Sequence, residues 1–103
     1  MPAYIVSLCE FTNVTPSLKE YAQKSADLVH QHGGKYIVRG KPSENVEGDK
    51  FAGKSMVIVE FPTMEQLQAY LKNDDYQKNV KPLRKGTGIY DISVYEAPPL
   101  HKQ

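Results

Sequence analysis

The stretch HQHGGKYIVRG, residues 30–40, marks the junction between a helix and a strand. Before it, apolar side chains recur at helical spacing behind Thr15 and Pro16, which suit an N-cap and the first position of a helix. Gly33 or Gly34 can supply the left-handed residue that ends such a helix. The glycines do not form a phosphate-binding loop, because such a loop precedes a helix and this pair follows one. KYIVRG then predicts a strand.

Working outward from this junction, the chain divides into six main elements. Short β-prone segments at residues 3–11, 55–61 and 86–97 predict three further strands. Thr63 and Gln66 form a capping box that predicts a second helix, and a short helical piece precedes the last strand. The order β-α-β-β-α-β predicts a ferredoxin-like α+β fold, with helices on one face of a four-stranded antiparallel sheet.

Length and composition restrict the class of protein. The 103 residues predict one domain, which we assign to residues 1–97, with a C-terminal tail at residues 98–103. The 13 basic and 12 acidic side chains give a net charge of +1, so no basic field predicts binding to nucleic acid or to a membrane. No apolar run approaches the ~20 residues of a spanning helix. The single Cys9 excludes an internal disulfide and, without a signal-peptide pattern, predicts a cytoplasmic protein.

The predicted strands carry apolar side chains on both faces of the sheet. Helices can cover only one face, so Ile5, Ile37, Met56 and Ile58 would meet water on the other. A second copy of the chain could cover them. We therefore expect a homodimer that forms through the open face of the sheet.

Arg39 is the most informative charged residue, because it lies inside an apolar strand and needs a partner there. Strict alternation places it on the same face as Ile37. If that face is the one opposite the helices, its polar neighbours would be Ser7, Cys9, Glu60, Asp91, Ser93 and Tyr95. Arg39 then either forms a structural or intersubunit ion pair with Glu60 or Asp91, or holds an anion beside a carboxylate base in a cleft.

His32 lies at the predicted helix end, where an imidazole either favours the helix dipole or acts as a general base or hydrogen-bonding group. His30 and His32 point in different directions on a helix, and no nearby Cys or carboxylate completes a zinc-type set. We therefore predict no metal site.

The chain has seven tyrosines and no tryptophan, so tyrosines supply most of its aromatic surface. Tyr36, Tyr70 and Tyr95 are the candidates for a cleft wall, whereas Tyr21 and Tyr76 suit the core with their hydroxyls at its margin. Cys9 lacks an activating neighbour in the sequence and is expected to be a buried, inert thiol.

Two segments, HGGKYIVRG and VIVEFPTMEQLQAYLKNDDYQ, resemble the family called domain of unknown function 1330, of the dimeric α/β-barrel superfamily. The resemblance extends over most of the chain, from AYIV to SVYE. The residues that carry it are His32, Gly33, Gly34, Tyr36, Arg39, Gly40, Glu60, Phe61, Pro62, Met64, Glu65, Tyr76 and Gln77. Tyr70 and Leu71 depart from it by replacing a Trp-Tyr pair, which changes one wall of the cleft. Smaller departures are Lys41, Thr63, Asp74 and Asp75.

The resemblance implies a homodimer whose two sheets close into a barrel, with a cleft between sheet and helices in each protomer. Superfamily relatives include cofactor-free monooxygenases, lactone isomerases, polyketide cyclases and haem-degrading enzymes, and fold analogy does not choose among them.

We therefore expect a cofactor-independent enzyme of isomerase, cyclase or monooxygenase type that acts on a small oxygenated molecule. Arg39 would hold a carboxylate or a developing oxyanion, and His32 or Glu60 would move a proton. The ligand-binding candidates are Tyr36, Tyr70, Asp91 and Tyr95. A non-catalytic binding or stress-linked module, and a structural dimer without a ligand, are the alternatives.

Overall fold

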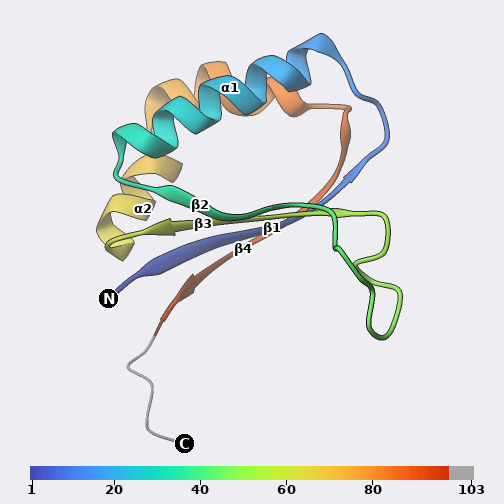
Figure 1. Cartoon of the computed structure of the whole chain (residues 1–103). Helices are drawn as coiled ribbons and strands as arrows, with labels where there is room; N and C mark the ends of the chain where they lie inside the picture. Colours follow the sequence, from blue (N-terminus) through green and yellow to red (C-terminus); the bar gives the residue numbers. More distant parts are fainter. Residues whose placement is uncertain (98–103) are drawn as a thin grey trace, which may run out of the picture.

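The computed structural model describes residues 1–97, and the predicted tail at 98–103 lies outside the described residues. The elements in chain order are β1 (Ala3–Phe11), α1 (Pro16–Gln31), β2 (Lys35–Gly40), β3 (Ser55–Phe61), α2 (Met64–Leu71), the π-helical turn η1 (Tyr76–Val80), the 3-10 turn η2 (Lys81–Arg84) and β4 (Gly88–Glu96). The antiparallel strands follow the order β2-β3-β1-β4, so β2 and β4 are the edges. All helices lie on one face of the sheet (Figure 1). The predicted α+β ferredoxin-like fold is confirmed.

Both main helices begin where their capping residues predict. The Thr15 hydroxyl accepts a hydrogen bond from the backbone N–H of Leu18 at 3.2 Å, and Pro16 occupies the first helical position of α1. The Thr63 hydroxyl accepts from the backbone N–H of Gln66 at 3.1 Å in the same way. These local signals set the start of each helix without help from tertiary packing.

The end of α1 needs both glycines, for different reasons. Gly33 has a φ of +82°, the left-handed conformation that ends many helices. Gly34 is buried, and a Cβ there would lie 2.7 Å from Cε1 of Phe61 and 2.8 Å from Cγ1 of Val29. The close approach of helix end and sheet therefore excludes any side chain at residue 34.

The core fills the space between the sheet and the helices. Its buried members are Ala3, Ile5, Leu28, Val29, Val59, Phe61, Leu67, Tyr70, Tyr76 and Val80. Phe61 and Leu67 are 0% exposed and join the end of β3 to α2. The odd-numbered residues of β1 face this core, so the expectation that Ile5 lies on the open face is wrong.

The other side of the sheet, here called the open face, has no helix over it. It is formed by Tyr4, Val6, Leu8, Val38, Met56, Ile58, Ile89 and Tyr95. In the single chain Val38 is 43%, Ile89 58% and Tyr95 57% exposed. The loop at residues 41–54 extends toward this side (Figure 1).

Within residues 1–97, none of the helices combines the length and apolar character needed to cross a membrane.

A β-bulge in β2 sets the direction of Arg39. Tyr36 pairs with Val59 and Val38 with Ile58, so Ile37 is an extra residue on this strand. The extra residue shifts the alternation by one position. Tyr36 and Arg39 consequently both face the helices, and the prediction that Arg39 shares a face with Ile37 is wrong.

Candidate functional site

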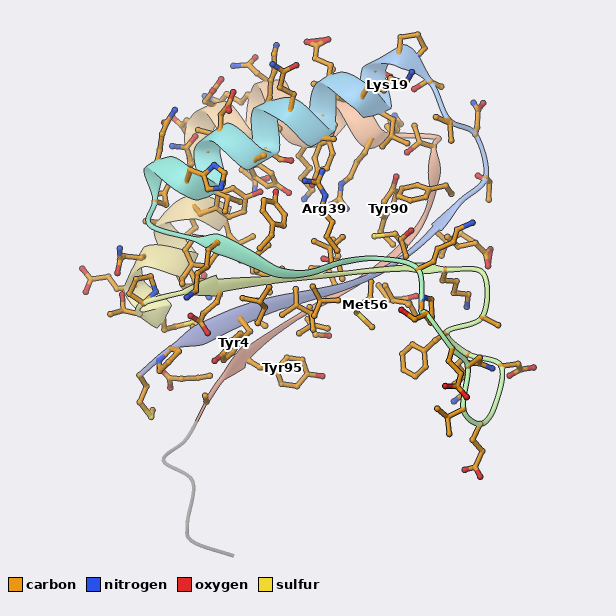
Figure 2. The ribbon with its side chains drawn as sticks, viewed as in Figure 1. Tyr4, Lys19, Arg39, Met56, Tyr90 and Tyr95 are labelled. Atoms are coloured by element: carbon orange, nitrogen blue, oxygen red, sulfur yellow. The ribbon has the colours of Figure 1, made fainter. Side chains whose placement is uncertain are left out.

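A cavity of about 590 Å³ lies between the helix-covered face of the sheet and the helices α1, η1 and η2. All four strands contribute to its floor, and Arg39 and Tyr90 project into it from the sheet (Figure 2). Tyr4, Met56 and Tyr95 point to the other side of the sheet in the same view. The cavity is therefore separated from the open face by the full thickness of the sheet.

The two ends of this cleft differ in exposure. The inner end, next to α2, is lined by Val29, Val59 and Tyr70, which are at most 5% exposed. The mouth lies beneath the start of α1, where Phe11 is 43% and Val14 66% exposed. A ligand would therefore enter at the mouth and place its least polar part at the inner end.

Four cationic side chains line the cleft: Lys19, Arg39, Lys81 and Arg84. No Asp, Glu or His among residues 1–97 belongs to the lining. Likewise, none of the ion pairs formed within residues 1–97 involves Arg39 or Arg84. The cleft therefore presents positive charge that no neighbouring carboxylate neutralises, which favours an anionic ligand.

Both arginines are held against tyrosine rings. The guanidinium carbon of Arg39 lies 4.9 Å from the ring centroid of Tyr36. That of Arg84 lies 4.9 Å from the centroid of Tyr90 and 5.6 Å from that of Tyr21. Stacking uses the flat face of a guanidinium and leaves the N–H donors at its edge available for a carboxylate or oxyanion.

Thr87 fixes the segment that carries Arg84. Thr87 is 1% exposed, and its hydroxyl donates to the Arg84 carbonyl and can accept from the Tyr90 hydroxyl. Its carbonyl accepts from the backbone N–H groups of Thr12 and Asn13 at 2.9 and 3.0 Å. One buried threonine thus joins η2, β4 and the β1–α1 connection at the mouth of the cleft.

Buried tyrosines supply neutral hydroxyls behind the arginines. The hydroxyl oxygens of Tyr21 and Tyr76 are 3.3 Å apart. Burial, followed by the proximity of Tyr76, raises the pKa values of Tyr21 and Tyr70 above their usual range. Burial also raises the pKa of Tyr36, although Ser25 and the charge of Arg39 oppose it. These phenols stay protonated at neutral pH and can donate hydrogen bonds to a ligand oxygen.

Raising the pH above about 10 is expected to destabilise the folded protein. Unfolded tyrosines ionise near the ordinary pKa of 10.0, whereas Tyr21 and Tyr70 hold their protons in the folded state. The unfolded state then binds fewer protons, so the free energy of unfolding falls by up to about 1.4 kcal/mol per pH unit for each such group. Urea unfolding at about pH 9 and about pH 11 measures this fall. Tyr70→Phe should make this fall in the free energy of unfolding smaller. An unchanged fall would contradict the raised pKa of Tyr70.

The cleft brings together three of the predicted site residues: Tyr36, Arg39 and Tyr70. His32 is not part of the lining. Its Nδ1 lies 2.8 Å from the Leu28 carbonyl oxygen, to which it donates, and its ring centroid is 6.1 Å from that of Tyr70. His32 therefore lies outside the cleft, next to the lining residue Tyr70. Its role in proton transfer stays a prediction.

Glu60, Asp91 and Tyr95 lie on the open face, because they pair with Tyr4 and Leu8 of β1, whose side chains point that way. Glu60 forms an ion pair there, with Nζ of Lys35 3.4 Å from its Oε1. It also raises the pKa of Tyr4 by accepting a hydrogen bond.

The bulge in β2 turns Arg39 to the other side of the sheet. Residues 1–97 accordingly contain no ion pair between Arg39 and Glu60 or Asp91. The predicted grouping of Arg39 with Glu60, Asp91, Ser93 and Tyr95 is wrong for this reason, and the functional roles of Glu60, Asp91 and Tyr95 stay predictions. Ser7 and Cys9, the other two predicted neighbours, do line the cleft with Arg39.

Several lining residues were not predicted as part of a site. Arg84 and Tyr90 come from segments far from Arg39 in the sequence. Cys9, which was expected as a neighbour of Arg39, pairs with Tyr90 on the floor of the cleft. Burial raises the pKa of the Cys9 thiol more than the charge of Arg84 lowers it, in agreement with an inert thiol. Among these residues, only Tyr21 has a usable signal in the sequence, because its position on the apolar stripe of the helix directs its side chain toward the sheet.

Comparisons with known proteins place these observations in context. A family model described as domain of unknown function (DUF1330) matches residues 2–98. No curated protein matches the sequence. Residues 1–97 hold no cluster of three His, Cys, Asp or Glu side chains suited to a metal ion.

The fold is similar to several solved structures. A protein of unknown function from Rhodopseudomonas palustris has a TM-score of 0.72 at 16% identity, over 98% of this chain and 84% of that one. SnoaB, a cofactor-independent oxygenase from Streptomyces nogalater, has a TM-score of 0.64 at 11% identity, over 99% and 98%. A hypothetical protein from Arabidopsis thaliana has a TM-score of 0.61 at 17% identity, over 98% and 92%. At these identities the similarity establishes the fold alone.

Proposed function

The chain belongs to the DUF1330 family, whose description assigns no function, and we propose a function from its cleft. The protein is a cofactor-independent enzyme that binds a small oxygenated molecule in anionic form and stabilises negative charge on its oxygen. One observation carries this proposal: Arg39 and Arg84 line a cleft that contains no carboxylate from residues 1–97. A carboxylate, an enolate or a phenolate would suit this environment.

The chemistry follows from the positions of the donors. Charges interact more strongly in a partly buried cleft than in water, because the effective dielectric constant is lower. Arg39 and Arg84 are each held against a tyrosine ring before a ligand arrives, and the hydroxyl of Tyr36 is neutral. Donors fixed in this way stabilise an oxyanion without reorganisation, which is how enzymes lower the barrier to enolate formation.

The proton in such a reaction must leave without a carboxylate or imidazole in the cleft wall. The substrate would therefore carry an acidic C–H or O–H group whose pKa the two arginines lower. When that bond breaks, its electron pair stays on the substrate as an enolate or phenolate, and the proton passes to water at the mouth. SnoaB shares the fold and is a cofactor-independent oxygenase, so the fold is compatible with chemistry of this class.

A second candidate is a binding module without catalysis. It is favoured by the same lining, since no carboxylate or imidazole among residues 1–97 faces the cavity. The two functions differ in turnover: a binding module returns its ligand unchanged, whereas the enzyme converts it.

We also propose that the protein is a cytoplasmic homodimer formed through the open face. The support is physical: no helix covers the eight apolar or aromatic side chains of the open face, and three of them, Val38, Ile89 and Tyr95, are exposed in the single chain. The thiol of Cys9 is unpaired, as expected in a reducing compartment.

The test of the proposed function is a thermal-shift screen of small carboxylates, phenols and 1,3-diketones, with mass spectrometry of each hit after incubation with and without oxygen. We expect stabilisation by acidic members and none by their neutral methyl esters or ethers. For each acidic hit, at least one of Arg39→Gln and Arg84→Gln should weaken binding about 10- to 100-fold, as loss of a charge-assisted hydrogen bond does. Lys72→Gln, which removes the same charge at the end of α2 outside the cleft, should bind as the parent does.

One result distinguishes the enzyme from the binding module, and another would show that the proposed site is wrong. Binding without conversion of any hit would leave the binding module and exclude the enzyme for those compounds. Stabilisation that survives both arginine substitutions would overturn the proposed site.

A further inference from the structure

The two arginines of the cleft are held on opposite sides of it. Arg39 belongs to β2 and stacks on Tyr36 of the same strand. Arg84 stacks on Tyr90, which belongs to β4. β2 and β4 are the two edges of the sheet, with β3 and β1 between them. Three inter-strand spacings put these edge strands roughly 14 Å apart. Because each guanidinium lies against a tyrosine of its own edge strand, we assign the two groups to separate poles of the cleft.

The two poles carry different amounts of charge. Lys81 and Arg84 are three residues apart on the 3-10 turn η2, where side chains at that spacing eclipse one another. Both line the cleft, so this pole presents two cations. At the other pole Arg39 stands next to the Tyr36 ring. The stronger pole suits a fully ionised group such as a carboxylate, and the weaker one suits an oxygen that shares its charge with a ring.

The helix side of the cleft carries aromatic rings, whereas β1 and β3, the strands between the poles, contribute smaller side chains such as Ser7, Cys9 and Val57. Tyr21 lies under Arg84, with the centroid 5.6 Å from the guanidinium carbon, and its hydroxyl lies 3.3 Å from that of Tyr76. The rings of Tyr70 and Tyr76 are 4.8 Å apart between centroids, at the inner end. A flat ligand body can lie against these rings with more contact than a flexible chain, which would lose rotamer freedom on binding.

We propose that the ligand is a planar molecule with two oxygen-bearing groups, a carboxylate held by Arg84 with Lys81 and a carbonyl, enol or phenol oxygen held by Arg39. This inference rests on the proposed function, because it names the substrate class of the same cleft. The reacting oxygen is the one at Arg39, where the neutral Tyr36 hydroxyl is also available. The carboxylate at Arg84 serves to anchor and orient the molecule.

The test uses three matched probes with the whole protein: naphthalene-2,6-dicarboxylate, 2-naphthoate and the neutral dimethyl ester of the first. The chain contains no tryptophan, so energy transfer from its tyrosines to the naphthalene ring reports binding directly. We expect the dicarboxylate to bind about 10-fold or more tighter than 2-naphthoate, since it engages both poles. Arg39→Gln should remove this advantage while leaving 2-naphthoate affinity nearly unchanged, because a single carboxylate occupies the Arg84 pole.

Arg84→Gln gives the complementary result. Both acids should lose affinity in this variant, and Arg84→Lys, which keeps the charge without the bidentate fork, should recover part of the loss. Lys72→Gln is the matched control, and circular dichroism melts of every variant verify that it folds. Should one glutamine variant fail to fold, the Arg→Lys variant at the same residue provides the comparison.

The possible failures are distinguishable. Equal affinity of the parent protein for the dicarboxylate and for 2-naphthoate would overturn the two-pole assignment and leave the proposed anion site intact. Equal losses for 2-naphthoate in Arg39→Gln and Arg84→Gln would overturn it too, because both arginines would then hold one group. Binding of the neutral ester as tight as that of the dicarboxylate would overturn the anion site itself.

Discussion

Glutamate in place of Ile58 is expected to prevent formation of the proposed homodimer. Ile58 lies near the middle of the open face, paired with Val6 of β1 on one side and with Val38 of β2 on the other. In a symmetric dimer through this face, each subunit would bury one carboxylate without a partner. Leaving a buried charge unpaired costs several kcal/mol, so two such groups should weaken association by more than about 1000-fold.

Size-exclusion chromatography with light scattering at micromolar concentration measures this change. Gln23→Glu is the matched control, because it adds the same carboxylate at an exposed site on α1, on the other side of the sheet. Ile89→Glu on β4, where the parent side chain is 58% exposed in the single chain, tests the same face at its edge with little cost to the monomer fold. If both open-face variants stay dimeric, the dimer forms elsewhere. If the parent protein is a monomer, the open face has no partner copy.

The fold could be predicted because its signals are local. Thr15, Pro16 and Thr63 start their helices through hydrogen bonds or backbone angles of neighbouring residues. Gly33 ends α1 with a positive φ that other residues rarely adopt. None of these features depends on what the rest of the chain does, so reading the sequence in short windows finds them.

The direction of Arg39 could not be predicted in the same way. Strict alternation assigns it to the face of Ile37, and one extra residue in β2 reverses that assignment. No sequence signal marks this bulge, since Tyr36, Ile37 and Val38 are all ordinary strand residues. The error then passed to the charged partners chosen for Arg39 by alternation, Glu60 and Asp91, whereas Ser7 and Cys9 do line the cleft with Arg39.

The second pole of the cleft is a tertiary feature. Arg84 reaches the cleft because η2 packs beside α1 and because Thr87 ties the end of η2 to Tyr90. Tyr21 and Tyr76 meet across 55 residues of sequence. Such convergence depends on the packing of short, irregular turns, which periodicity does not describe. Functional residues on segments of this kind are the ones that sequence reasoning misses.

Alanine in place of Phe61 is expected to produce the largest loss of stability of any single change considered. Phe61 is 0% exposed, and its ring centroid lies 5.7 Å from that of Tyr70. Truncation of a buried phenylalanine costs about 3 to 5 kcal/mol, a large part of the 5 to 15 kcal/mol that stabilises a typical domain. Urea unfolding followed by circular dichroism measures the loss. Phe11→Ala, where the ring is 43% exposed, should cost much less.

The close contact between the Phe61 ring and Gly34 leads to a second prediction. Gly34→Ala alone should cost about 1 to 3 kcal/mol, because its Cβ would meet Phe61 ring atoms at 2.7 and 2.9 Å. In the Phe61→Ala background those atoms are absent, and only Cγ1 of Val29 at 2.8 Å still opposes the new methyl group. The two substitutions should therefore be non-additive, with the double variant more stable than the sum of the single losses by about 1 kcal/mol. Strict additivity would mean that Val29 rather than Phe61 requires glycine at the helix end.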